Sequence, residues 1–412
     1  MEKVQVFIVG AGPSGLATAA CLIKLSIPHV VVEREDCIAS LWRKHTYNCL
    51  KLHIAKEFCE LPLMSYPNDS PTYILKDNFL RYLDDYVMKF NISPKFNTSV
   101  ESCMYDEAGN YWSIMAQDKV SGKTSHYASK FLVVATGENS AGNIPDIAGL
   151  QSFHGEAIHS SSYKCGSDYV GKSVLVVGSG NSGFEIAHDL AIHGADTSIV
   201  IRSPVCTQFV DIIFYSQICC DIEPIFTLFI VKFHVMTKEL IHLGMILARW
   251  RLSLILVDFI LVLLAYLLFG DLSKHGIVRP HMGPLLLKAK TGRSAVIDVG
   301  TTKLIKKGDI KVFGPISRIR GNLIEFEDGN ERYYDALLFA TGYKSTANIC
   351  LKKDMSMLNS DGLPKNEFPN HWKGTNGLYC VGFARRGLAG IAHDAEIVAS
   401  DIQANIKMTL FD

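Results

Sequence analysis

Two glycine-rich motifs of identical spacing are the residues of this sequence best suited to do chemistry. GAGPSG at 10–15 follows the apolar stretch VQVFIV, and GSGNSG at 178–183 follows VLVV. In a strand–turn–helix unit, the first glycine permits the tight turn, the second lets the backbone approach a pyrophosphate, and the third lets the helix pack close to the strand. The glycines in these places are Gly10, Gly12 and Gly15, then Gly178, Gly180 and Gly183. One copy is weak evidence, but two copies predict two dinucleotides and electron transfer between them.

The strand that follows each motif ends in a charged residue. Glu33 ends the first and Arg202 ends the second. An acid accepts hydrogen bonds from the ribose hydroxyls of an adenosine and repels a 2′-phosphate, whereas an arginine binds a 2′-phosphate. The alternatives are an acid that only caps a surface strand and an ordinary surface arginine. The contrast between the two copies favours the cofactor roles, with NADP preferred to NAD at the second motif.

Two βαβ units must position these residues. The first has strands at 4–9 and 30–33 around a helix at 13–25, and the second has strands at 174–177 and 197–201 around a helix at 181–192. The apolar strand at 130–135 runs into an Ala-Thr-Gly turn, and the apolar strand at 336–343 contains a second one. The polar, turn-rich residues 153–164 indicate a linker. Further predictions are a surface helix at 79–90, a C-terminal helix at 392–408, and strands over 100–116, 296–299, 310–313, 317–319, 323–326 and 378–386.

Composition excludes several classes of protein. The 412 residues contain 41 basic and 41 acidic side chains, so no basic excess indicates a nucleic-acid partner. The eleven cysteines are scattered and no CxxC occurs, which argues against a dithiol redox centre and a zinc ribbon. No secretory signal precedes the first strand, so we expect a reducing, cytoplasmic setting.

Much of the positive mean hydropathy comes from residues 206–269. Residues 252–269 carry Asp258 as their only charge, and their length makes them a borderline membrane span. An aspartate at the centre of a span costs about 2.5 to 3.5 kcal/mol on insertion. We therefore favour packed or peripheral helices. Membrane contact, for example at the surface of the endoplasmic reticulum, is the less favoured alternative.

The order of the motifs is specific. GxGxxG with Glu33 is followed by ATG, by FxGxxxHxxxY, by GxGxxG with Arg202, and by a second ATG. This order resembles that of the flavin-containing monooxygenases, and nearly the whole chain is similar to the YUCCA family of plant flavin monooxygenases. The residues of FxGxxxHxxxY are Phe153, Gly155, His159 and Tyr163. Other matching stretches are KLHIAKEFCELPLM (51–64), ATGENS (135–140), GPLLLKAKTGRSAVIDVG (283–300), ATGYKS (340–345) and GFARRGLAG (382–390).

The resemblance implies an α/β fold with two Rossmann-like dinucleotide-binding domains, the NADPH domain being inserted in the FAD domain. The expected FAD-binding parts are 1–164 and 343–412, and the expected NADPH-binding domain is 165–342. By the same resemblance Gly10, Gly12, Gly15 and Glu33 bind FAD, and Gly178, Gly180, Gly183 and Arg202 bind NADPH. The two ATG turns would connect the domains.

The activity that the resemblance implies uses NADPH and O2 to convert indole-3-pyruvate, a 2-oxo acid, to indole-3-acetate, the plant hormone auxin, with loss of CO2. The oxygen chemistry would take place on the flavin, as a peroxide at C4a, so we assign no catalytic side chain and no metal site. The disulfide reductases that share this fold usually have a CxxC, which is absent here.

Four other side chains have two interpretations each. Arg385 and Arg386 could bind a substrate carboxylate, because arginine suits planar bidentate recognition, or could form a solvated pair on a turn. His53 could approach the flavin or pack inside the protein. His159 and Tyr163 are better interpreted as packing residues of the linker than as acid–base catalysts.

The sequence departs from the family at two places. Ala55 stands where the family usually has a proline, and residues 206–233 read as an insertion, such as a retained intron. The insertion begins close to Arg202, so it could disturb NADPH binding. Three hypotheses follow: a 2-oxo-acid monooxygenase, a flavin monooxygenase that oxygenates nitrogen or sulfur in another metabolite, and a variant inactivated by the insertion.

Overall fold

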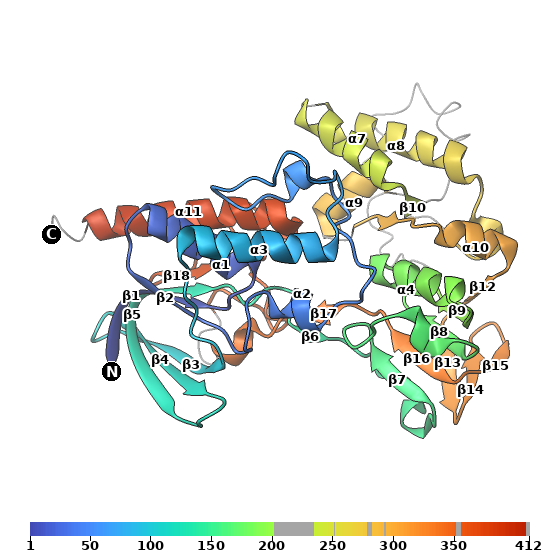
Figure 1. Ribbon diagram of the computed structural model, residues 1–412, viewed down its shortest axis with the longest axis horizontal. Coiled ribbons are helices and arrows are strands. Elements are labelled where there is room, and N and C mark those ends of the chain that lie inside the picture. The colour runs from blue at the N-terminus through green and yellow to red at the C-terminus, as the bar shows by residue number, and fades with distance from the viewer. Residues whose placement is uncertain (202–234, 251, 278–281, 292–293, 352–355, 409–412) are drawn as a thin grey trace, which may run out of the picture. The chain divides into compact units, whose positions relative to one another are not determined.

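The computed structural model describes residues 1–201, 235–250, 252–277, 282–291, 294–351 and 356–408. The chain divides into two compact units, drawn in Figure 1. The first is Met1–Asn143 with Gly342–Asp412, and the second is Ile144–Thr341. The second unit is therefore inserted in the first. The first boundary falls after Asn143, so the expected linker at 153–164 belongs to the second unit and not to the first.

The first unit is built on a six-stranded sheet of order β2-β1-β5-β4-β3, with β18 beside β5. β1, β2, β5 and β18 pair in parallel and form the Rossmann-like part, whereas β3 and β4 pair antiparallel. The expected strand at 100–116 is therefore two strands and a turn. The bounds are β1 (Glu2–Val9), β2 (His29–Val32), β3 (Thr98–Asp106), β4 (Tyr111–Asp118), β5 (Thr124–Val134) and β18 (Leu378–Cys380). A short antiparallel pair joins β6 (Ala141–Gly142) to β17 (Tyr343–Lys344).

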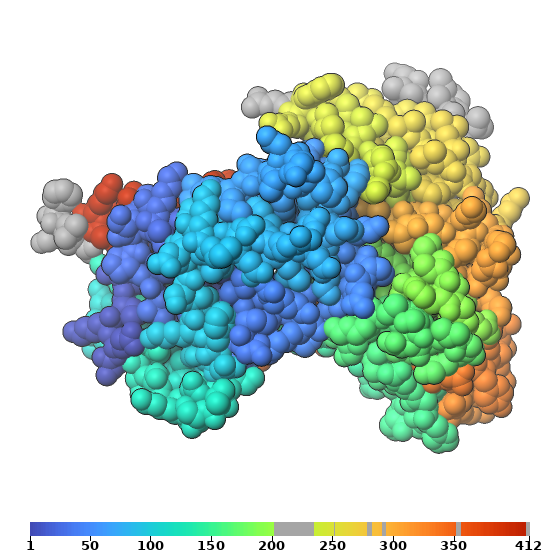
Figure 2. Space-filling view, in the orientation of Figure 1, coloured from blue at the N-terminus to red at the C-terminus, as the bar shows by residue number. Residues whose placement is uncertain are grey.

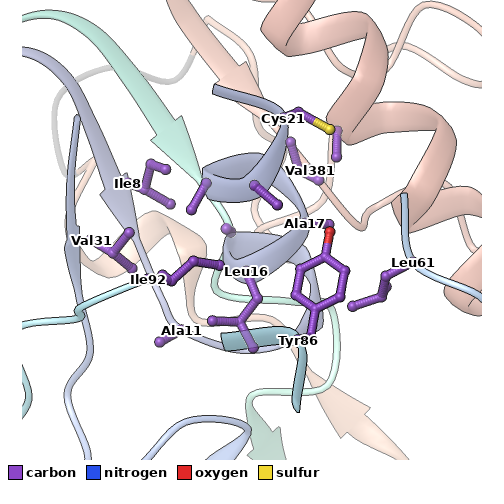
Figure 3. Packing of buried hydrophobic residues seen from close by; sticks show 14 of the residues in the cluster. Ile8, Ala11, Leu16, Ala17, Cys21, Val31, Leu61, Tyr86, Ile92 and Val381 are labelled. Carbon is purple, nitrogen blue, oxygen red and sulfur yellow. The ribbon is translucent and has the colours of Figure 1, made fainter. Parts of the chain in front are cut away.

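Helices cover one face of this sheet. They are α1 (Pro13–Lys24), α3 (Lys76–Phe90) and α11 (Gly387–Met408), and a short helix α2 (Ser40–Lys44) follows β2. Because side chains alternate along a strand, Ile8 points into the helical layer while Phe7 packs on the opposite face. Figure 3 shows Leu16 of α1 among Ile8, Ala11 and Ile92, all buried. Burying one such leucine contributes about 1.5 to 3 kcal/mol. This packing fixes α1 behind the first glycine turn.

The second unit contains a five-stranded parallel sheet of order β12-β9-β8-β16-β7. Its central helix, α4 (Asn181–Ile192), has the predicted bounds. The strands are β7 (Glu156–His159), β8 (Ser173–Val177), β9 (Asp196–Val200), β12 (Ile310–Phe313) and β16 (Ala336–Phe339). Smaller elements are an antiparallel sheet of β13 (Ile316–Arg320), β14 (Leu323–Phe326) and β15 (Glu331–Tyr333), the parallel pair β10 (Val235–Met236) and β11 (Val296–Ile297), and α10 (Thr301–Lys307).

The expected linker contributes an edge strand. β7 pairs with β16, with Glu156 opposite Ala336 and His159 opposite Phe339. The linker interpretation was therefore wrong for residues 156–159. A four-residue edge strand has too short and too polar a pattern to be separated from a turn by periodicity alone.

Two helices, α7 (Lys238–Arg249) and α8 (Leu254–Phe269), form the described part of the apolar region 206–269. A third helix, α9 (Pro284–Thr291), packs against α8. In Figure 2, α7 and α8 lie at the surface of this unit, coloured yellow. Asp258 is buried at 5% exposure, and its two carboxylate oxygens accept backbone N–H groups of Leu285 and Leu286 at 2.8 and 3.0 Å. The single charge of α8 therefore caps the N-terminus of α9.

Among the described residues, none of the helices combines the length and the hydropathy needed to cross a bilayer. Several side chains of α8 are exposed nevertheless, including Ile255, Leu267 and Leu268. Residues 206–233, the expected insertion, lie outside the described residues, and so does Arg202.

Candidate cofactor sites

A large cavity opens in the first unit at the carboxyl ends of β1, β2 and β5. Its volume is about 370 Å³. Of the residues predicted from the sequence, Gly10, Gly12, Glu33, Arg385 and Arg386 all line it. Ligands of open α/β sheets bind at the carboxyl ends of the strands, and this volume lies within the roughly 300 to 1,000 Å³ of small-molecule pockets. The cavity therefore has the position of a dinucleotide site in this class of fold.

A different structural feature explains the glycine at each of the three positions of the first motif. Gly10 has φ +108°, and a β-carbon there would lie 2.7 Å from the Ala135 carbonyl oxygen. A β-carbon on Gly15 would lie 1.9 Å from the Gly10 carbonyl oxygen, so α1 could not pack against the turn. Around Gly12, by contrast, no described atom lies within 4 Å of such a β-carbon. The protein does not need glycine at position 12 for its own packing, so the open space is what a closely approaching ligand requires.

Glu33 is buried at 8% exposure beside the glycine turn. Its Oε2 accepts the backbone N–H of Ala11 at 2.8 Å, and its Oε1 accepts that of Glu35 at 3.0 Å. Each carboxylate oxygen has two lone pairs, so each retains one acceptor site. Glu33 thus ties the end of β2 to the glycine turn and can still accept ribose hydroxyls. Its burial argues against a role as an exposed strand cap, and binding of the ribose hydroxyls stays a prediction.

A second helix begins at the same cavity. α11 starts at Gly387, five residues before the predicted start, and its first turn lines the cavity through Gly387, Leu388 and Ile391. Helix N-termini carry partial positive charge, so α1 and α11 both favour an anion here. Arg385 and Arg386 precede α11 and are exposed on the turn, and the Arg386 guanidinium lies 3.7 Å from the centre of the Phe368 ring. The two arginines are therefore both exposed and part of the cavity wall.

Two residues that support the turn at 382–386, directly before α11, were not predicted from the sequence. Asp394 of α11 is fully buried; its Oδ2 accepts the Gly382 N–H at 3.0 Å, and its Oδ1 accepts the Nε2 hydrogen of buried His371 at 3.1 Å. Gly382 lines the cavity, and a β-carbon there would lie 2.1 Å from the Ser14 hydroxyl oxygen. An aspartate two turns inside a helix looks like any solvent-facing acid in the sequence, so no local pattern reveals this role.

Two further sequence expectations concern the region 51–64. His53 is partly buried and does not line the described cavity, so its proximity to a flavin gains no support. Ala55 is fully buried with φ −60° and ψ 148°. That φ is the value that proline imposes, so alanine at position 55 keeps the backbone conformation that a proline would have.

Each glycine motif, 10–15 or 178–183, forms a cradle together with the Ala-Thr-Gly turn behind it. The contacts of the second cradle repeat those of the first almost atom for atom. Gly178 has φ +116°, and its β-carbon would lie 2.5 Å from the Ala340 carbonyl oxygen. A β-carbon on Gly183 would lie 2.0 Å from the Gly178 carbonyl oxygen, and one on Gly180 would have no described atom within 4 Å. Ala135 and Ala340 each open an Ala-Thr-Gly turn. The repeated ATG is therefore explained: its alanine carbonyl supports the first glycine of each cradle.

The residues of FxGxxxHxxxY belong to the second unit and have packing roles. A β-carbon on Gly155 would lie 2.2 Å from the Asp335 carbonyl oxygen and 2.8 Å from the Phe153 ring. Tyr163 is buried and donates its hydroxyl hydrogen to Asp189 Oδ2 at 2.6 Å. His159 Nδ1 contacts the Ser161 hydroxyl at 3.0 Å. These contacts hold the edge strand β7 and the start of the sheet together.

One group of side chains in the described part of the chain has metal-binding residue types. Ligand atoms of Cys165, Asp189 and His193 lie within 4.8 Å of one another. Asp189 Oδ2 already accepts the Tyr163 hydroxyl and the Gly166 N–H, and His193 Nδ1 donates to the Asp189 carbonyl oxygen at 2.7 Å. These hydrogen bonds assign the group to packing.

Comparisons with known proteins agree with the two cradles. The family model described as pyridine nucleotide-disulphide oxidoreductase matches residues 7–232. The Arabidopsis thaliana protein named "Probable indole-3-pyruvate monooxygenase YUCCA10" is 47% identical over 405 residues, which cover 98% of each chain. "Indole-3-pyruvate monooxygenase YUCCA6" of the same plant is 42% identical over 402 residues, covering 96% of this chain and 89% of that one.

Solved structures share the fold at lower identity. A double mutant of a flavin monooxygenase from Stenotrophomonas maltophilia aligns with a TM-score of 0.69 at 17% identity, covering 98% of this chain and all of the other. That likeness establishes the two-domain, Rossmann-like fold. The identity with the plant proteins over nearly the full length establishes more: the chain belongs to the YUCCA family of indole-3-pyruvate monooxygenases.

Proposed function

We propose that this protein uses FAD, NADPH and O2 to convert indole-3-pyruvate to indole-3-acetate and CO2. The observation that carries the proposal is the repeated cradle, in which both units of one chain present an open glycine at the same place, Gly12 and Gly180. Two such cradles suit a nicotinamide cofactor that reduces a flavin. The similarity to indole-3-pyruvate monooxygenases over nearly the full length supports the choice of substrate.

In the first unit, Gly10, Gly12, Gly15 and Glu33 would hold FAD. The N-terminus of α1 would bind the pyrophosphate near Gly12, and Glu33, which accepts the N–H groups of Ala11 and Glu35, would accept the ribose hydroxyls with its remaining lone pairs. Asp394 holds Gly382 in the opposite wall. Bound FAD, once reduced, supplies the activation of O2, and the protein supplies binding, orientation and exclusion of water.

In the second unit, Gly178, Gly180 and Gly183 would bind the pyrophosphate of NADPH at the N-terminus of α4. Asn181, in the first turn of α4, accepts the Ile297 N–H on Oδ1 at 2.7 Å and so fixes that end of the helix. Arg202 would bind the 2′-phosphate. Its support is the sequence alone, because it lies outside the described residues.

Arg385 and Arg386 would bind the carboxylate of the 2-oxo acid. Two anions compete for this wall of the cavity, the dinucleotide pyrophosphate and the substrate carboxylate. The glycine turn and two helix N-termini already suit the pyrophosphate, which leaves the guanidinium groups for the carboxylate.

As part of the same proposal the protein works in the cytoplasm, with the surface of the endoplasmic reticulum as the alternative.

The experiment compares substrate classes with purified, FAD-loaded protein and NADPH. Indole-3-pyruvate should stimulate NADPH oxidation and give indole-3-acetate. Tertiary amines and thioethers, as soft nucleophiles, should give neither stimulation nor N- or S-oxides. Oxygenation of the amine or thioether without any indole-3-acetate would reject the proposed substrate class and favour the second hypothesis.

A further inference from the structure

We propose that Cys103 and Cys350 form a reversible disulfide in the wall of the cavity in the first unit. Cys103 lies in β3 and is fully buried. Cys350 directly follows the short 3-10 helix Ala347–Ile349 and is buried at 5% exposure. Both belong to the apolar cluster on the face of the sheet opposite the helices. Of the two cysteines, Cys350 also lines the cavity.

The backbone holds the pair at bonding range. The Cys103 N–H donates to the Cys350 carbonyl oxygen at 2.7 Å, so β3 and the end of the turn at 347–350 lie side by side at these two residues. A disulfide needs Cα atoms about 4.4 to 6.8 Å apart, which two residues joined by a backbone hydrogen bond can meet. Their thiols also hydrogen-bond to each other. The bridge therefore needs side-chain rotation and little movement of the backbone.

The two thiols are chemically unequal. The hydrogen bond from Cys103 lowers the pKa of the Cys350 thiol below its usual range, whereas the same hydrogen bond and burial raise the pKa of Cys103. The thiolate is the nucleophile in thiol oxidation, so Cys350 would react first. It is also the cysteine of the pair that an oxidant in the cavity can reach. Cys103 is placed to resolve the product.

The reaction balances with hydrogen peroxide as the oxidant. The Cys350 thiolate attacks one peroxide oxygen, the O–O bond breaks, and the departing hydroxide takes a proton, leaving a sulfenic acid and water. Cys103 sulfur then attacks the Cys350 sulfur, its proton leaves with the hydroxyl as a second water, and the S–S bond forms. Two thiols lose two electrons and one peroxide gains them. A thiol reductant reverses the step.

The bridge would change the shape of the cavity. Thr346, Ile349 and Cys350 line it from one segment, and Val100, close to Cys103 in β3, lines it beside them. Turning the Cys350 side chain onto Cys103 changes the surface that Cys350 presents to the cavity, so we expect the oxidised protein to bind FAD about tenfold more weakly. This consequence rests on the proposed FAD site, whereas formation of the disulfide does not.

The test uses full-length, FAD-loaded protein treated with a small excess of hydrogen peroxide, then alkylated and digested with trypsin. Cys103, Cys350 and Cys380 fall on separate tryptic peptides, 96–119, 345–352 and 374–385, each with one cysteine. The expected result is a cross-link between 96–119 and 345–352 that dithiothreitol removes. Recovery of both peptides as free thiols, or as products of overoxidation only, overturns the proposal.

Cys380 provides the matched control. It is fully buried in the same cluster, but its thiol contacts Met357 sulfur at 3.6 Å. C380S should leave the cross-link unchanged, whereas C350S should abolish it and leave Cys103 reduced. FAD affinity is measured before and after oxidation in the wild type and in C350S. Equal affinities in the cross-linked protein would refute the effect on the cavity, and failure of the reduced protein to bind FAD would count against the proposed function alone.

Discussion

A β-carbon on Gly10 would approach the carbonyl oxygen of Ala135 to 2.7 Å, so the turn after β5 closes directly on the turn after β1. The same relationship holds in the second unit between Gly178 and Ala340, at 2.5 Å. In both units, therefore, the strand beside the first βαβ strand ends in a small-residue turn that supports the glycine turn from behind. The side of each cradle that faces Gly12 or Gly180 is left open.

The contrast between Gly10 and Gly12 gives the first prediction. Gly12→Ala should leave the free energy of unfolding of the apoprotein almost unchanged, because Gly12 has φ −75° and free space around it. It should weaken FAD binding at least about tenfold, since the added methyl group takes the space of the ligand. Gly10→Ala should destabilise the apoprotein itself by about 1 to 3 kcal/mol, through positive φ and the Ala135 contact.

Thermal unfolding of the apoproteins and FAD titration measure these two effects separately. If Gly12→Ala and Gly10→Ala destabilise the apoprotein equally, the space at Gly12 is required by the protein and not by a ligand.

Glu33→Gln should lower both stability and FAD affinity. The amide keeps one acceptor oxygen and presents an NH2 group to the second of two backbone donors, Ala11 and Glu35 N–H. Placing the buried NH2 group against a backbone N–H, with no acceptor between them, lowers the free energy of unfolding by about 1 to 3 kcal/mol. Glu2→Gln is the control, since Glu2 is exposed, lies outside the cavity lining and pairs with Lys95 at 3.3 Å. An unaltered melting temperature and FAD affinity in Glu33→Gln would contradict the two hydrogen bonds.

The Asp258→Leu variant distinguishes between two interpretations of α8, a helix packed on the protein and a helix that spans a membrane. In the structure Asp258 caps α9, so its loss should cost about 2 to 3 kcal/mol and lower the melting temperature by several degrees. Leu267→Ser, at a 71% exposed position of the same helix, should have little effect. Increased recovery of Asp258→Leu in the membrane fraction, without loss of stability, would instead support a span.

Much of the fold was predictable because its signals are local. The glycine motifs, the apolar strands around them and the helix at 181–192 follow from spacing and periodicity. The strand β7 and the early start of α11 were not predictable, since a short edge strand and a glycine-rich first turn lack a clear period. The roles of Asp394 and of Cys103 with Cys350 depend on contacts between residues distant in the chain, which periodicity does not contain.

Arg202→Ala tests the cofactor preference inferred from the second motif. Removing the guanidinium should raise KM for NADPH by about tenfold or more and leave KM for NADH nearly unchanged, because only NADPH carries the 2′-phosphate. Arg318→Ala, at an exposed position in β13, is the control. Steady-state kinetics with both nucleotides measure the effect. A parallel rise in both KM values would show that Arg202 does not distinguish the cofactors.

We expect the protein itself to insert oxygen from O2 into a 2-oxo acid. The most direct measurement is turnover of indole-3-pyruvate under ¹⁸O2 with FAD, NADPH and an excess of catalase. Catalase is needed because hydrogen peroxide released into solution decarboxylates 2-oxo acids without an enzyme. We predict indole-3-acetate with one ¹⁸O atom in its carboxyl group and one CO2 for each NADPH consumed. Loss of indole-3-acetate when catalase is present, or indole-3-acetate without ¹⁸O, would show that the enzyme does not insert the oxygen.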